Sequence, residues 1–581
     1  MTRIVEEHSF PTHDGLDLFY RRWPVAGTRR GAVVLFHRGH EHGGRMAHLV
    51  DEMDLPDFDF YAWDARGHGR SPGVRGDSPS LGDSVRDVQT FIDHLCAAWK
   101  LDESDIAVVA QSVGAVLASA WAHDYAPRIR CQVLASPAFR VKLYAPFARQ
   151  ALALWRAMRG NFFVNSYVKS HYLTHDPDRQ ASFDADPLIS RAISVNVLLG
   201  LFEAAERVVA DAEAITVPTQ LLISGDDWVV HHWPQHAFFA RLGATEKEKH
   251  VLPGFYHDTL GEKYRADPIG KARDFLLRQF AMPPARPDLR DEHKHGHTFE
   301  EARNLAVPYP PLSLAGLYWR AYRGLLKLAG RVSDGVRLGH RTGFDSGSSL
   351  DYIYRNVPSG CGFLGRAIDR VYLDAIGWRG IRQRKAHLEE LLREAIARLR
   401  KEERPERILD IAAGHGRYVL DALLCCPRPE AILLRDFSEL NVEKGRALIA
   451  ERGLEDIARF EQGDAFDRAG LAALVPKAGV GIVSGLYELF PDNDRVAASL
   501  LGLRDAIEEG GYLVYTGQPW HPQLEMIARA LTSHRDGQPW VMRRRTQAEM
   551  DQLVREAGFE KLAERIDGWG IFSVSLARRV R

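Results

Sequence analysis

The sequence predicts an α/β protein that contains two separate parallel sheets, each flanked by helices. Two series of short β-branched runs alternate with amphipathic segments, one ending near residue 280 and the other starting near residue 405. A stretch rich in proline and charge separates the two series, and a chain of 581 residues is too long for one core. We therefore expect two domains, each with its own sheet.

The composition is that of an ordinary globular protein, with 45% hydrophobic and 26% charged residues. Lysine plus arginine (76) nearly equals aspartate plus glutamate (77), so no overall positive field indicates nucleic-acid binding. Five irregularly spaced cysteines argue against a disulfide framework or a zinc site. No apolar stretch has the form of a signal peptide or the ~20-residue length of a bilayer span. We expect a soluble, cytoplasmic protein.

The first series contains six segments that have the pattern of buried strands. Amphipathic segments separate them, which predicts a parallel sheet with helices on its faces. Residues 138–212 interrupt this rhythm, because they are mostly helical and carry several aromatic side chains. An insertion this long between two strands predicts a helical cap rather than a loop. The predicted strands are GAVVLFH (31–37), FDFYAWD (58–64), DIAVVAQ (105–111), IRCQVLAS (129–136), TQLLISG (219–225) and KHVLPG (249–254).

The third strand leads directly into a helical pattern, and Ser112 lies at the junction. The stretch Ala110-Gln111-Ser112-Val113-Gly114 approaches the G-x-S-x-G pattern, in which small residues let the backbone make a sharp strand-to-helix turn under a nucleophilic serine. Alanine replaces the first glycine. The alternative is a plain turn or helix-capping serine, which this pattern alone does not exclude.

A serine nucleophile needs a base and an acid that orients the base. The fifth strand ends in Asp226-Asp227, and His257 follows the sixth strand, so both lie on loops at the carboxyl edge of the sheet. The alternatives are a surface turn for the aspartates and a structural loop histidine. The order serine, acid, histidine at successive strand ends favours a catalytic set of Ser112, Asp227 and His257.

The loop after the first strand, His37–Arg45, is the predicted source of an oxyanion hole. Such a hole needs backbone N–H groups aimed at the developing negative charge, and the expected donors are the amides of Gly39 and Val113. The run His40-Glu41-His42 could instead hold a metal ion. We disfavour that alternative, because the loop already has a role at the nucleophile, and we expect no metal site.

The first half resembles the monoacylglycerol lipase and lysophospholipase branch of the α/β-hydrolases over about residues 8–280. The stretches that carry the resemblance are HRGHEHGGR, WDARGHGRSPG, AQSVGA, DADPLISRA, SGDDWVV and GFYHD. The resemblance implies an α/β-hydrolase domain over residues 1–281, Asp227 rather than Asp226 as the acid, and acylglycerol or lysophospholipid-type esters as substrates. Arg38 departs from the family, which usually has glycine there, and so does Ala110.

Residues 282–344 are expected to link the two halves, because AMPPARPDLRDEHKHGHTF and LAVPYPPL are rich in proline and charge. Within this stretch, residues 313–335 have a helical pattern that mixes aromatic and basic side chains. Two interpretations remain open for this amphipathic helix. It contacts a membrane surface peripherally, or it lies buried at the interface between the domains.

The second series contains five predicted strands, and the first of them ends in a loop of small residues. Asp410 precedes this loop, which includes Ala412, Gly414 and Gly416 and lets a ligand approach the backbone closely. A nicotinamide dinucleotide is the alternative ligand, but Asp410 would repel its pyrophosphate and suits a cationic ligand. The strands are RILDIAAG (407–414), AILLRDF (431–437), ARFEQGDAF (458–466), VGIVSGLYELF (480–490) and GYLVYTGQ (511–518).

The next strand ends carry side chains with the chemistry of a nucleoside site. Asp436 ends the second strand, where a carboxylate can accept both ribose hydroxyls, and Asp464-Ala465 at the end of the third suits an adenine amino group. Ser484, at the end of the fourth, begins the segment where a methyl acceptor should bind. The alternative for each carboxylate is a helix N-cap after a strand. Their occurrence at successive strand ends favours ligand binding.

The second half resembles class I S-adenosylmethionine-dependent methyltransferases over about residues 345–578, with a Rossmann-like fold and S-adenosylmethionine as the implied cofactor. LDIAAGHG departs from the commoner D-x-G-x-G-x-G at Ala412. The helical lead-in at 345–403, TGFDSGSSLDYIYRN…GWRGIRQRK, resembles a methyltransferase subgroup found fused behind a hydrolase, and is expected to close over the cofactor. The acceptor-side candidates, each with a structural alternative, are Tyr352, His415, Tyr487 and Glu488.

Together these patterns predict a bifunctional enzyme: a serine esterase or lipase over 1–281, joined to a methyltransferase over 345–581. Expected partners are a small-molecule or lipid ester and an unidentified methyl acceptor, with no nucleic acid. The runner-up is an active hydrolase with a non-catalytic cofactor- or lipid-binding second half. The oligomeric state is left open.

Overall fold

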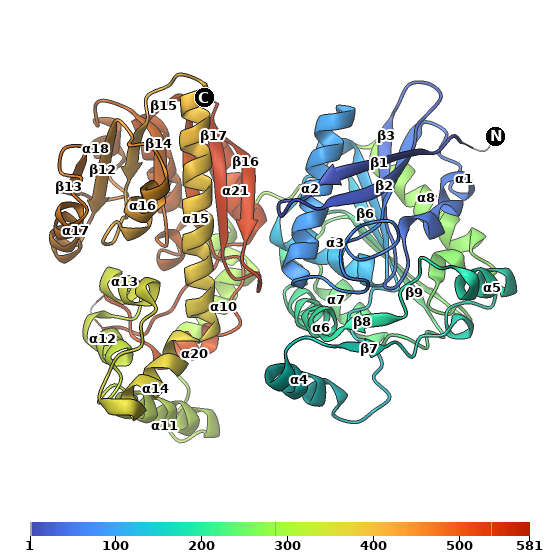
Figure 1. Ribbon diagram of the computed structural model, residues 1–581, viewed down its shortest axis with the longest axis horizontal. Coiled ribbons are helices and arrows are strands. Elements are labelled where there is room, and N and C mark those ends of the chain that lie inside the picture. The colour runs from blue at the N-terminus through green and yellow to red at the C-terminus, as the bar shows by residue number, and fades with distance from the viewer. Residues whose placement is uncertain (1–2, 285, 536, 581) are drawn as a thin grey trace. The chain divides into compact units, whose positions relative to one another are not determined.

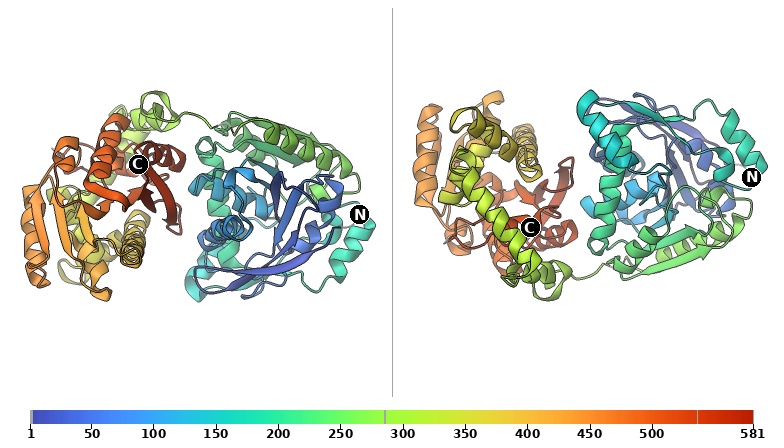
Figure 2. Two further views of the ribbon diagram at one scale, coloured as in Figure 1. Left: turned by 90° about the horizontal axis from the view of Figure 1, so that it is seen from above. Right: turned by 90° about the horizontal axis from the view of Figure 1, so that it is seen from below.

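The computed structural model describes residues 3–284, 286–535 and 537–580, which form two compact units divided between Pro287 and Asp288 (Figure 1). Each unit is built around its own sheet, and helices lie on both faces of each sheet (Figure 2). The two sheets confirm the predicted α/β class.

Unit 1 contains an eight-stranded sheet with the order β1-β2-β4-β3-β5-β6-β9-β10. Six of its strands, β3, β4, β5, β6, β9 and β10, are parallel and match the six predicted from the sequence. Strands β1 and β2 pair antiparallel at one edge. These two strands alternate between buried and exposed residues, so they lack the continuous apolar runs of the inner strands. The strands are β1 Glu6–Pro11, β2 Asp17–Trp23, β3 Gly31–Phe36, β4 Phe58–Trp63, β5 Ile106–Gln111, β6 Cys131–Ala135, β9 Thr219–Ser224 and β10 Lys247–Leu252.

Helices cover the inner strands of unit 1 because those strands are apolar on both faces. On one face, Val33 and Leu35 of β3 pack in a core with Val50 of α1 (His48–Glu52) and Phe275 of α8 (Ala266–Ala281). On the other face are α2 (Leu81–Trp99) and α3 (Val113–Asp124). Helix α7 (Trp233–Arg241) lies between β9 and β10 in the chain.

The insertion between β6 and β9 contains the segment in which the sequence predicted the cap. It holds the helices α4 (Ala148–Arg159), α5 (Pro177–Ala185) and α6 (Val195–Ala210). It also contains a small antiparallel pair, β7 (Phe163–Asn165) with β8 (Ala192–Ser194), that the sequence did not reveal because each strand is only three residues long.

Unit 2 contains a seven-stranded sheet with the order β13-β12-β11-β14-β15-β17-β16. The five strands β11 to β15 are parallel and were predicted, whereas β16 and β17 add an antiparallel edge that was not. Strand β16 alternates between exposed and buried residues, as an edge strand does. The strands are β11 Arg407–Asp410, β12 Ala431–Asp436, β13 Ala458–Gln462, β14 Ala478–Val483, β15 Ile507–Gly517, β16 Phe559–Ile566 and β17 Ser573–Arg579.

Neighbouring residues of β11 point into two different cores, as the period of a strand requires. Ile408 packs with Leu392 of the long helix α15 (Ile376–Lys401), while Leu409 packs with Leu500 of α19 (Asn493–Ala506). The remaining helices around this sheet are α16 Arg417–Ala422, α17 Glu439–Glu451, α18 Arg468–Ala472, α20 Leu524–Ala530 and α21 Gln547–Glu556.

The predicted linker at 282–344 is wrong in extent, because unit 2 starts at Asp288. The proline-rich stretches are short breaks between helices. Hydrogen bonds from distant side chains attach these helices to the rest of the unit. Arg544 Nε donates to Glu301 Oε2 of α10 at 2.6 Å, and Arg529 Nη1 donates to the carbonyl of Leu305 at 2.8 Å. The helices before and within the lead-in are α9 Glu292–His295, α10 His297–Ala306, α11 Leu314–Ala329, α12 Asp334–Thr342, α13 Gly347–Arg355 and α14 Gly362–Leu373.

Candidate active sites

Ser112 occupies a strained turn between β5 and α3. Its backbone has φ 55° and ψ −114°, a conformation that side chains rarely adopt and that surrounding contacts must hold in place. Its N–H donates to the carbonyl of Ala135 at 2.9 Å, and its own carbonyl accepts from Ala138 at 3.2 Å. A Cβ at Gly114 would lie 2.5 Å from the carbonyl oxygen of His37, so only glycine fits two residues after Ser112.

Ser112, His257 and Asp227 form one hydrogen-bonded chain. Ser112 Oγ lies 2.7 Å from His257 Nε2, and His257 Nδ1 lies 2.7 Å from Asp227 Oδ2. All three residues are at least 96% buried. Asp226 is exposed, so the carboxylate that reaches the histidine belongs to Asp227.

The other oxygen of Asp227 fixes the direction of this chain. Oδ1 accepts the N–H groups of Val229 at 2.7 Å and Val230 at 3.0 Å. Burial by itself would raise the pKa of Asp227, but the nearby His257 and these hydrogen bonds lower the pKa below its usual value. The carboxylate therefore stays ionised and accepts the Nδ1 hydrogen of His257, which leaves Nε2 to accept the hydroxyl hydrogen of Ser112.

The two expected oxyanion-hole amides lie beside Ser112. A Cβ on Gly39 would lie 2.9 Å from Val113 Cγ2, so the loop after β3 touches the start of α3. Gly39 and Val113 line the same cavity as Ser112 and His257. Both residues therefore lie close to Ser112, and their role as oxyanion donors stays a prediction.

Arg38, the residue that departs from the resembled family, forms a buried ion-pair network. Its Nε donates to Glu41 Oε2 at 3.1 Å, and its Nη2 lies 3.4 Å from Asp258 Oδ2. Asp258 also accepts from Arg179 of the cap at 2.9 Å. Arg38 is therefore paired with two buried carboxylates, which it shares with Arg45 and Arg179.

The run His40-Glu41-His42 has partners other than a metal ion. Glu41 accepts hydrogen bonds from Arg38 and, at 3.1 Å, from Arg45 Nε. His42 Nε2 lies 3.0 Å from Asp186 Oδ2, which belongs to the cap. These contacts attach the loop after β3 to the cap.

An apolar cavity of about 530 Å³ lies over Ser112 and His257. Its walls come mainly from the cap and from the segment that leads into it, so a bound molecule would place its apolar part under the cap. Among the lining residues are Leu143, Leu152, Trp155, Phe183, Ile193 and Leu198.

In unit 2, Asp410 ends β11 and is completely buried. Its Oδ1 accepts the N–H of Ala412 at 3.1 Å, while its Oδ2 makes no close hydrogen bond in the described part of the chain, although the Tyr418 hydroxyl lies near enough to the carboxyl group to act against the rise of its pKa. Burial raises the pKa of Asp410 to about 7. A buried oxygen without a partner is costly, so Oδ2 is a strong place for a ligand donor.

Asp436 already binds the small-residue loop. Its Oδ2 accepts the N–H of Gly414 at 2.9 Å, and its Oδ1 accepts from the N–H of Ser438 at 2.9 Å and from Asn441 Nδ2 at 3.0 Å. A carboxylate has about four acceptor positions, so about one is left for a ligand. The sequence predicted that both oxygens face a ribose, and the structure does not have that arrangement.

The loop itself depends on glycine at 416. This residue has φ 76°, and a Cβ there would lie 2.5 Å from Leu434 Cδ1. Helix α13 lies against the loop, because a Cβ on Gly414 would come within 3.7 Å of Gly347 Cα, and Arg417 pairs with Asp351. The helical lead-in therefore lies against the loop, and its closure over a cofactor stays a prediction.

The remaining nucleoside candidates lie at the same edge of the sheet, after β13 and β14. Asp464 is exposed and accepts the N–H of Phe466 at 2.8 Å, as a turn residue does. Ala465 is buried in a core, and Ser484 is half-buried next to Gly485, whose N–H donates to Thr516 Oγ1 at 2.8 Å.

The four acceptor-side candidates differ in what surrounds their side chains. Tyr487 is turned into the core and donates to Ser499 at 3.0 Å, and Tyr352 is bonded to Asp369 and Ser359 within the lead-in. His415 lies on the glycine loop, 3.4 Å from Ser348 Oγ. Glu488 lines a cavity of about 280 Å³.

This cavity of about 280 Å³ lies entirely within unit 2, and most of its polar lining was not predicted from the sequence. Arg384 comes from α15, while Gln518 and His521 follow β15. The stretch GQPWHP, which comes directly after the fifth predicted strand, was the available signal for the last two.

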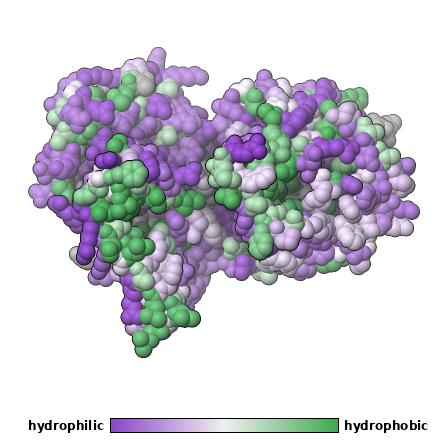
Figure 3. All heavy atoms as spheres, turned by 60° about the horizontal axis from the view of Figure 1, so that its bottom comes forward, coloured by the Kyte–Doolittle hydropathy of each residue, from purple (hydrophilic) through white to green (hydrophobic). Residues whose placement is uncertain are grey.

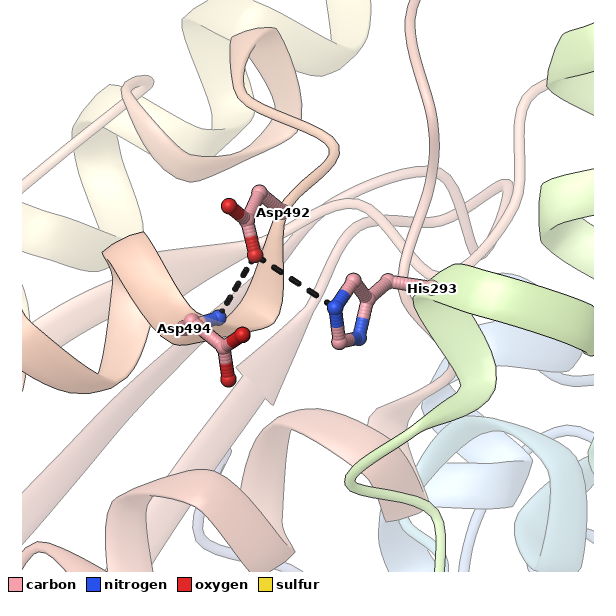
Figure 4. A group of neighbouring side chains, drawn as sticks. All are labelled: His293, Asp492 and Asp494. Atoms are coloured by element: carbon pink, nitrogen blue, oxygen red, sulfur yellow. Dashed lines mark hydrogen bonds and ion pairs between the residues drawn. The ribbon is translucent and has the colours of Figure 1, made fainter.

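One group of side chains in the described part of the chain has the spacing of a metal site: His293, Asp492 and Asp494 (Figure 4). His293 Nε2 lies 3.4 Å from Asp492 Oδ1, and the same carboxylate accepts the N–H of Asp494 as the N-cap of α19. The helix cap and the ion pair account for this group.

Comparison with known proteins identifies relatives for both halves. Residues 272–579 match the family described as "Putative methyltransferase", and residues 27–264 match the family described as "Serine aminopeptidase, S33". A protein of Escherichia coli (strain K12), "Uncharacterized protein YnbC", is 57% identical over 580 residues, covering 100% of this chain and 99% of that protein.

The first half has further relatives. The monoacylglycerol lipase of Mycolicibacterium smegmatis is 27% identical over 260 residues, covering 44% of this chain and 91% of that protein. The crystal structure of Paleococcus ferrophilus monoacylglycerol lipase has a TM-score of 0.41 and 23% identity, covering 45% of this chain and 99% of that one.

Proposed function

Since the chain belongs to the methyltransferase family matched by residues 272–579 and carries an α/β-hydrolase domain before it, we propose that it is a bifunctional enzyme. Unit 1 is a serine hydrolase that acts on acylglycerol or lysophospholipid-type esters. Unit 2 is a methyltransferase that uses S-adenosylmethionine.

The hydrolase proposal rests on the hydrogen-bonded chain from Ser112 through His257 to Asp227. In the first step, Ser112 Oγ attacks the ester carbonyl carbon while His257 Nε2 takes the hydroxyl proton. The amides of Gly39 and Val113 stabilise the oxyanion, and His257 then gives the proton to the departing alcohol. Water hydrolyses the acyl-serine by the same proton transfers in reverse order. Asp227 stays ionised and orients His257 throughout.

The cavity supports an ester with an apolar acyl chain as the substrate. Its walls are aliphatic and aromatic, and the buried charge of Arg38 is bound to carboxylates, so an acyl chain meets little competing polarity. The relative from Mycolicibacterium smegmatis, named a monoacylglycerol lipase, is consistent with this class.

The test of the hydrolase is turnover of monoacylglycerols and lysophospholipids with graded chain lengths. Covalent labelling with a fluorophosphonate, a reagent for activated serines, is measured in parallel. We expect hydrolysis and labelling of the wild type and neither in Ser112→Ala. Labelling at another residue, or unchanged turnover in the variant, would contradict the proposal.

For unit 2, the unpaired oxygen of Asp410 and the close-packed glycine loop fit a ligand that carries an amino group. S-adenosylmethionine supplies a transferable methyl group on a positively charged sulfur. Asp410 Oδ2 would accept from the amino group, and the free acceptor position of Asp436 would bind a ribose hydroxyl. Asp464 and Ala465 would hold the adenine, and Ser484 would lie beside the reacting end.

The test of the cofactor is calorimetric titration of the full chain with S-adenosylhomocysteine, with NAD as a comparison. We expect binding of the first and none of the second, because Asp410 would repel a pyrophosphate. Asp410→Asn should weaken binding by roughly ten- to a hundredfold, since it removes an ionic partner of a buried site. Absence of binding to the wild type would contradict the methyltransferase assignment.

A further inference from the structure

The cavity of about 280 Å³ in unit 2 has aromatic walls. Six aromatic side chains from three helices and three loops surround it, and the rings of Trp378 and Trp540 lie nearly parallel, with centroids 6.2 Å apart. The volume is just below the usual range for small-molecule sites, about 300–1,000 Å³. The aromatic residues are Tyr322, Phe344, Tyr372, Trp378, Trp540 and Phe572.

The cavity begins next to the proposed cofactor loop. Gly485 and Glu488, which follow β14, line it, and β14 pairs directly with β11, the strand that ends in Asp410. In that pairing Asp410 lies opposite Ile482, only three residues before Gly485. A molecule in the cavity therefore lies at the same edge of the sheet as the loop.

The polar groups that line the cavity are mainly hydrogen-bond donors without partners. Gln518 Nε2, Trp540 Nε1 and Arg384 Nε make no hydrogen bond in the described part of the chain, although all three residues are at least 93% buried. His521 Nδ1 accepts the N–H of Gln523 at 3.0 Å, so Nε2 carries the ring hydrogen. Unpaired buried donors are costly, and a ligand with oxygen lone pairs would satisfy them.

The acidic groups of the cavity balance its charge. Arg384 Nη1 lies 3.3 Å from Glu488 Oε1, so this buried pair is neutral as a whole. Asp345, the other acidic lining residue, is already bound by Ser533 Oγ and the N–H of His534 at 2.6 Å each. A neutral ligand preserves this balance, and Glu488 is the carboxylate available to accept a proton.

We propose that this cavity holds the methyl acceptor, a neutral and largely apolar molecule with an aromatic hydroxyl group. The inference rests on the methyltransferase function proposed above. The donors Gln518 and His521 bind the hydroxyl oxygen, and Glu488 accepts the proton that the hydroxyl loses. The oxygen thereby takes the methyl group of S-adenosylmethionine, which departs as a neutral thioether. An aromatic hydroxyl, with a pKa near ~10, gives up this proton far more readily than an aliphatic one.

The experiment measures binding of three probes to the full chain by calorimetry: 4-hexylphenol, its methyl ether and hexylbenzene. We expect 4-hexylphenol to bind at least about tenfold more tightly than hexylbenzene, because the donors are left unpaired by the hydrocarbon. Gln518→Leu should remove most of this preference. Glu525→Gln, a change on the exposed face of α20, should preserve it.

Titration with S-adenosylhomocysteine on the same samples separates the two proposals. Cofactor binding without any preference for the phenol would overturn the acceptor class and leave the methyltransferase function standing. Preference for the phenol without cofactor binding would overturn the methyltransferase function and support only a ligand site. Equal loss of the preference in Gln518→Leu and Glu525→Gln would overturn the role of Gln518.

Helices α11 and α14 line this cavity and also carry exposed apolar side chains. Helix α11 buries only Gly316 among its sixteen residues, and Leu314 is 89% exposed. In the described chain no helix has the length and apolarity of a membrane span. The face drawn in Figure 3 shows apolar side chains gathered on unit 2. The exposed apolar residues of α11 and α14 are Leu314, Leu317, Tyr318, Leu325, Leu328, Phe363, Leu364 and Val371.

The charge of α11 indicates what covers this face. The helix carries Arg320, Arg323 and Lys327 and has no acidic residue. Apolar and basic side chains on one exposed helix are typical of a segment that lies in the interface of an anionic bilayer. Tyr322 and Leu326 of the same helix line the cavity, so its occupant lies just beneath this face.

We infer that α11 and α14 dock on an anionic lipid surface. The experiment is sedimentation of the full chain with vesicles of phosphatidylcholine alone or mixed with phosphatidylglycerol. We expect binding to the mixed vesicles only, at least about tenfold weaker in Leu314→Ser/Leu325→Ser, since each change removes buried apolar area. The control Leu424→Ser/Val475→Ser changes two exposed apolar residues elsewhere on unit 2 and should bind like the wild type.

Three outcomes would overturn the lipid surface. The wild type could fail to bind mixed vesicles, or the two double variants could bind equally. Alternatively, the wild type could sediment as a dimer that Leu314→Ser/Leu325→Ser converts to a monomer, which would make a second copy of the chain the occupant of this face.

Discussion

Ser112 Oγ lies 2.7 Å from His257 Nε2, although 145 residues separate the two in the chain. The strained turn at Ser112 and the loop after β10 meet at the carboxyl edge of one sheet, beneath an apolar cavity. The hydroxyl and the base are therefore already within hydrogen-bonding distance, as proton transfer between them requires.

Ser112→Ala should abolish ester hydrolysis, with a loss of about four to six orders of magnitude in kcat. The alanine removes only the hydroxyl, so the fold and the binding of S-adenosylhomocysteine to unit 2 should be unchanged. Ester turnover and calorimetry on the same sample check both parts. Residual hydrolysis near the wild-type rate would exclude Ser112 as the nucleophile.

Asp227→Asn should reduce kcat about 10⁴-fold, because an amide cannot hold His257 in the required tautomer. The neighbouring exposed residue provides the matched control, and Asp226→Asn should leave kcat close to wild type. Steady-state kinetics with one monoacylglycerol is sufficient. If Asp226→Asn were the more damaging change, the assignment of the acid would be reversed.

Binding of S-adenosylhomocysteine should tighten as the pH rises toward 7. Burial raises the pKa of Asp410 to about 7, so the ligand-free carboxyl keeps its proton below that pH and must lose it to bind an ammonium group. The affinity should rise by up to about tenfold per pH unit below 7 and level off above it. Calorimetry from pH 5.5 to 8.5 measures this, and Asp410→Asn should show no such slope.

The raised pKa of Asp410 makes the folded chain less stable, relative to the unfolded chain, as the pH rises. Asp410 keeps its proton when folded and loses it near its ordinary value of 3.8 when unfolded. Its contribution to stability is therefore largest at pH values below that ordinary value, falls as the pH rises toward 7, and is constant above 7. The pH dependence of unfolding in wild type and Asp410→Asn should differ in this window.

Arg38→Ala should destabilise unit 1 by about 1–3 kcal/mol, because it removes hydrogen bonds to the buried carboxylate of Glu41, which keeps Arg45 as its remaining partner. Arg30 provides a control, since it is exposed and lies 3.9 Å from Asp57, so Arg30→Ala should cost about 0–1 kcal/mol. Urea unfolding followed by circular dichroism measures both. Similar stabilities of the two variants would contradict the structural role of the Arg38 network.

Two fragments, residues 1–287 and 288–581, should fold separately, because each contains a complete sheet and its own cores. A shorter fragment, residues 311–581, should be less stable than residues 288–581, since it lacks Glu301, the partner of Arg544. Thermal unfolding of the three fragments checks this. Aggregation of both longer fragments would contradict the division at Pro287.

Much of the fold could be predicted because it depends on local patterns. The six parallel strands of unit 1 and the five of unit 2 are continuous apolar runs, and the edge strands that were missed are polar on one side. The helices between 288 and 344 were underestimated for a similar reason. Their prolines and charges look like a linker, but contacts such as Arg544 with Glu301 come from residues distant in the chain.

The sequence by itself determined the two α/β units, the turn at Ser112 and the order of Ser112, Asp227 and His257, because hydrophobic periodicity and small residues at a tight turn act over a few neighbours. Only the tertiary structure decided that Asp436 binds its own loop, and that the donors of Gln518 and Trp540 lack partners beside a cavity. Hydrogen-bond and ion-pair partners depend on distances between segments far apart in the chain, and no local pattern specifies those distances.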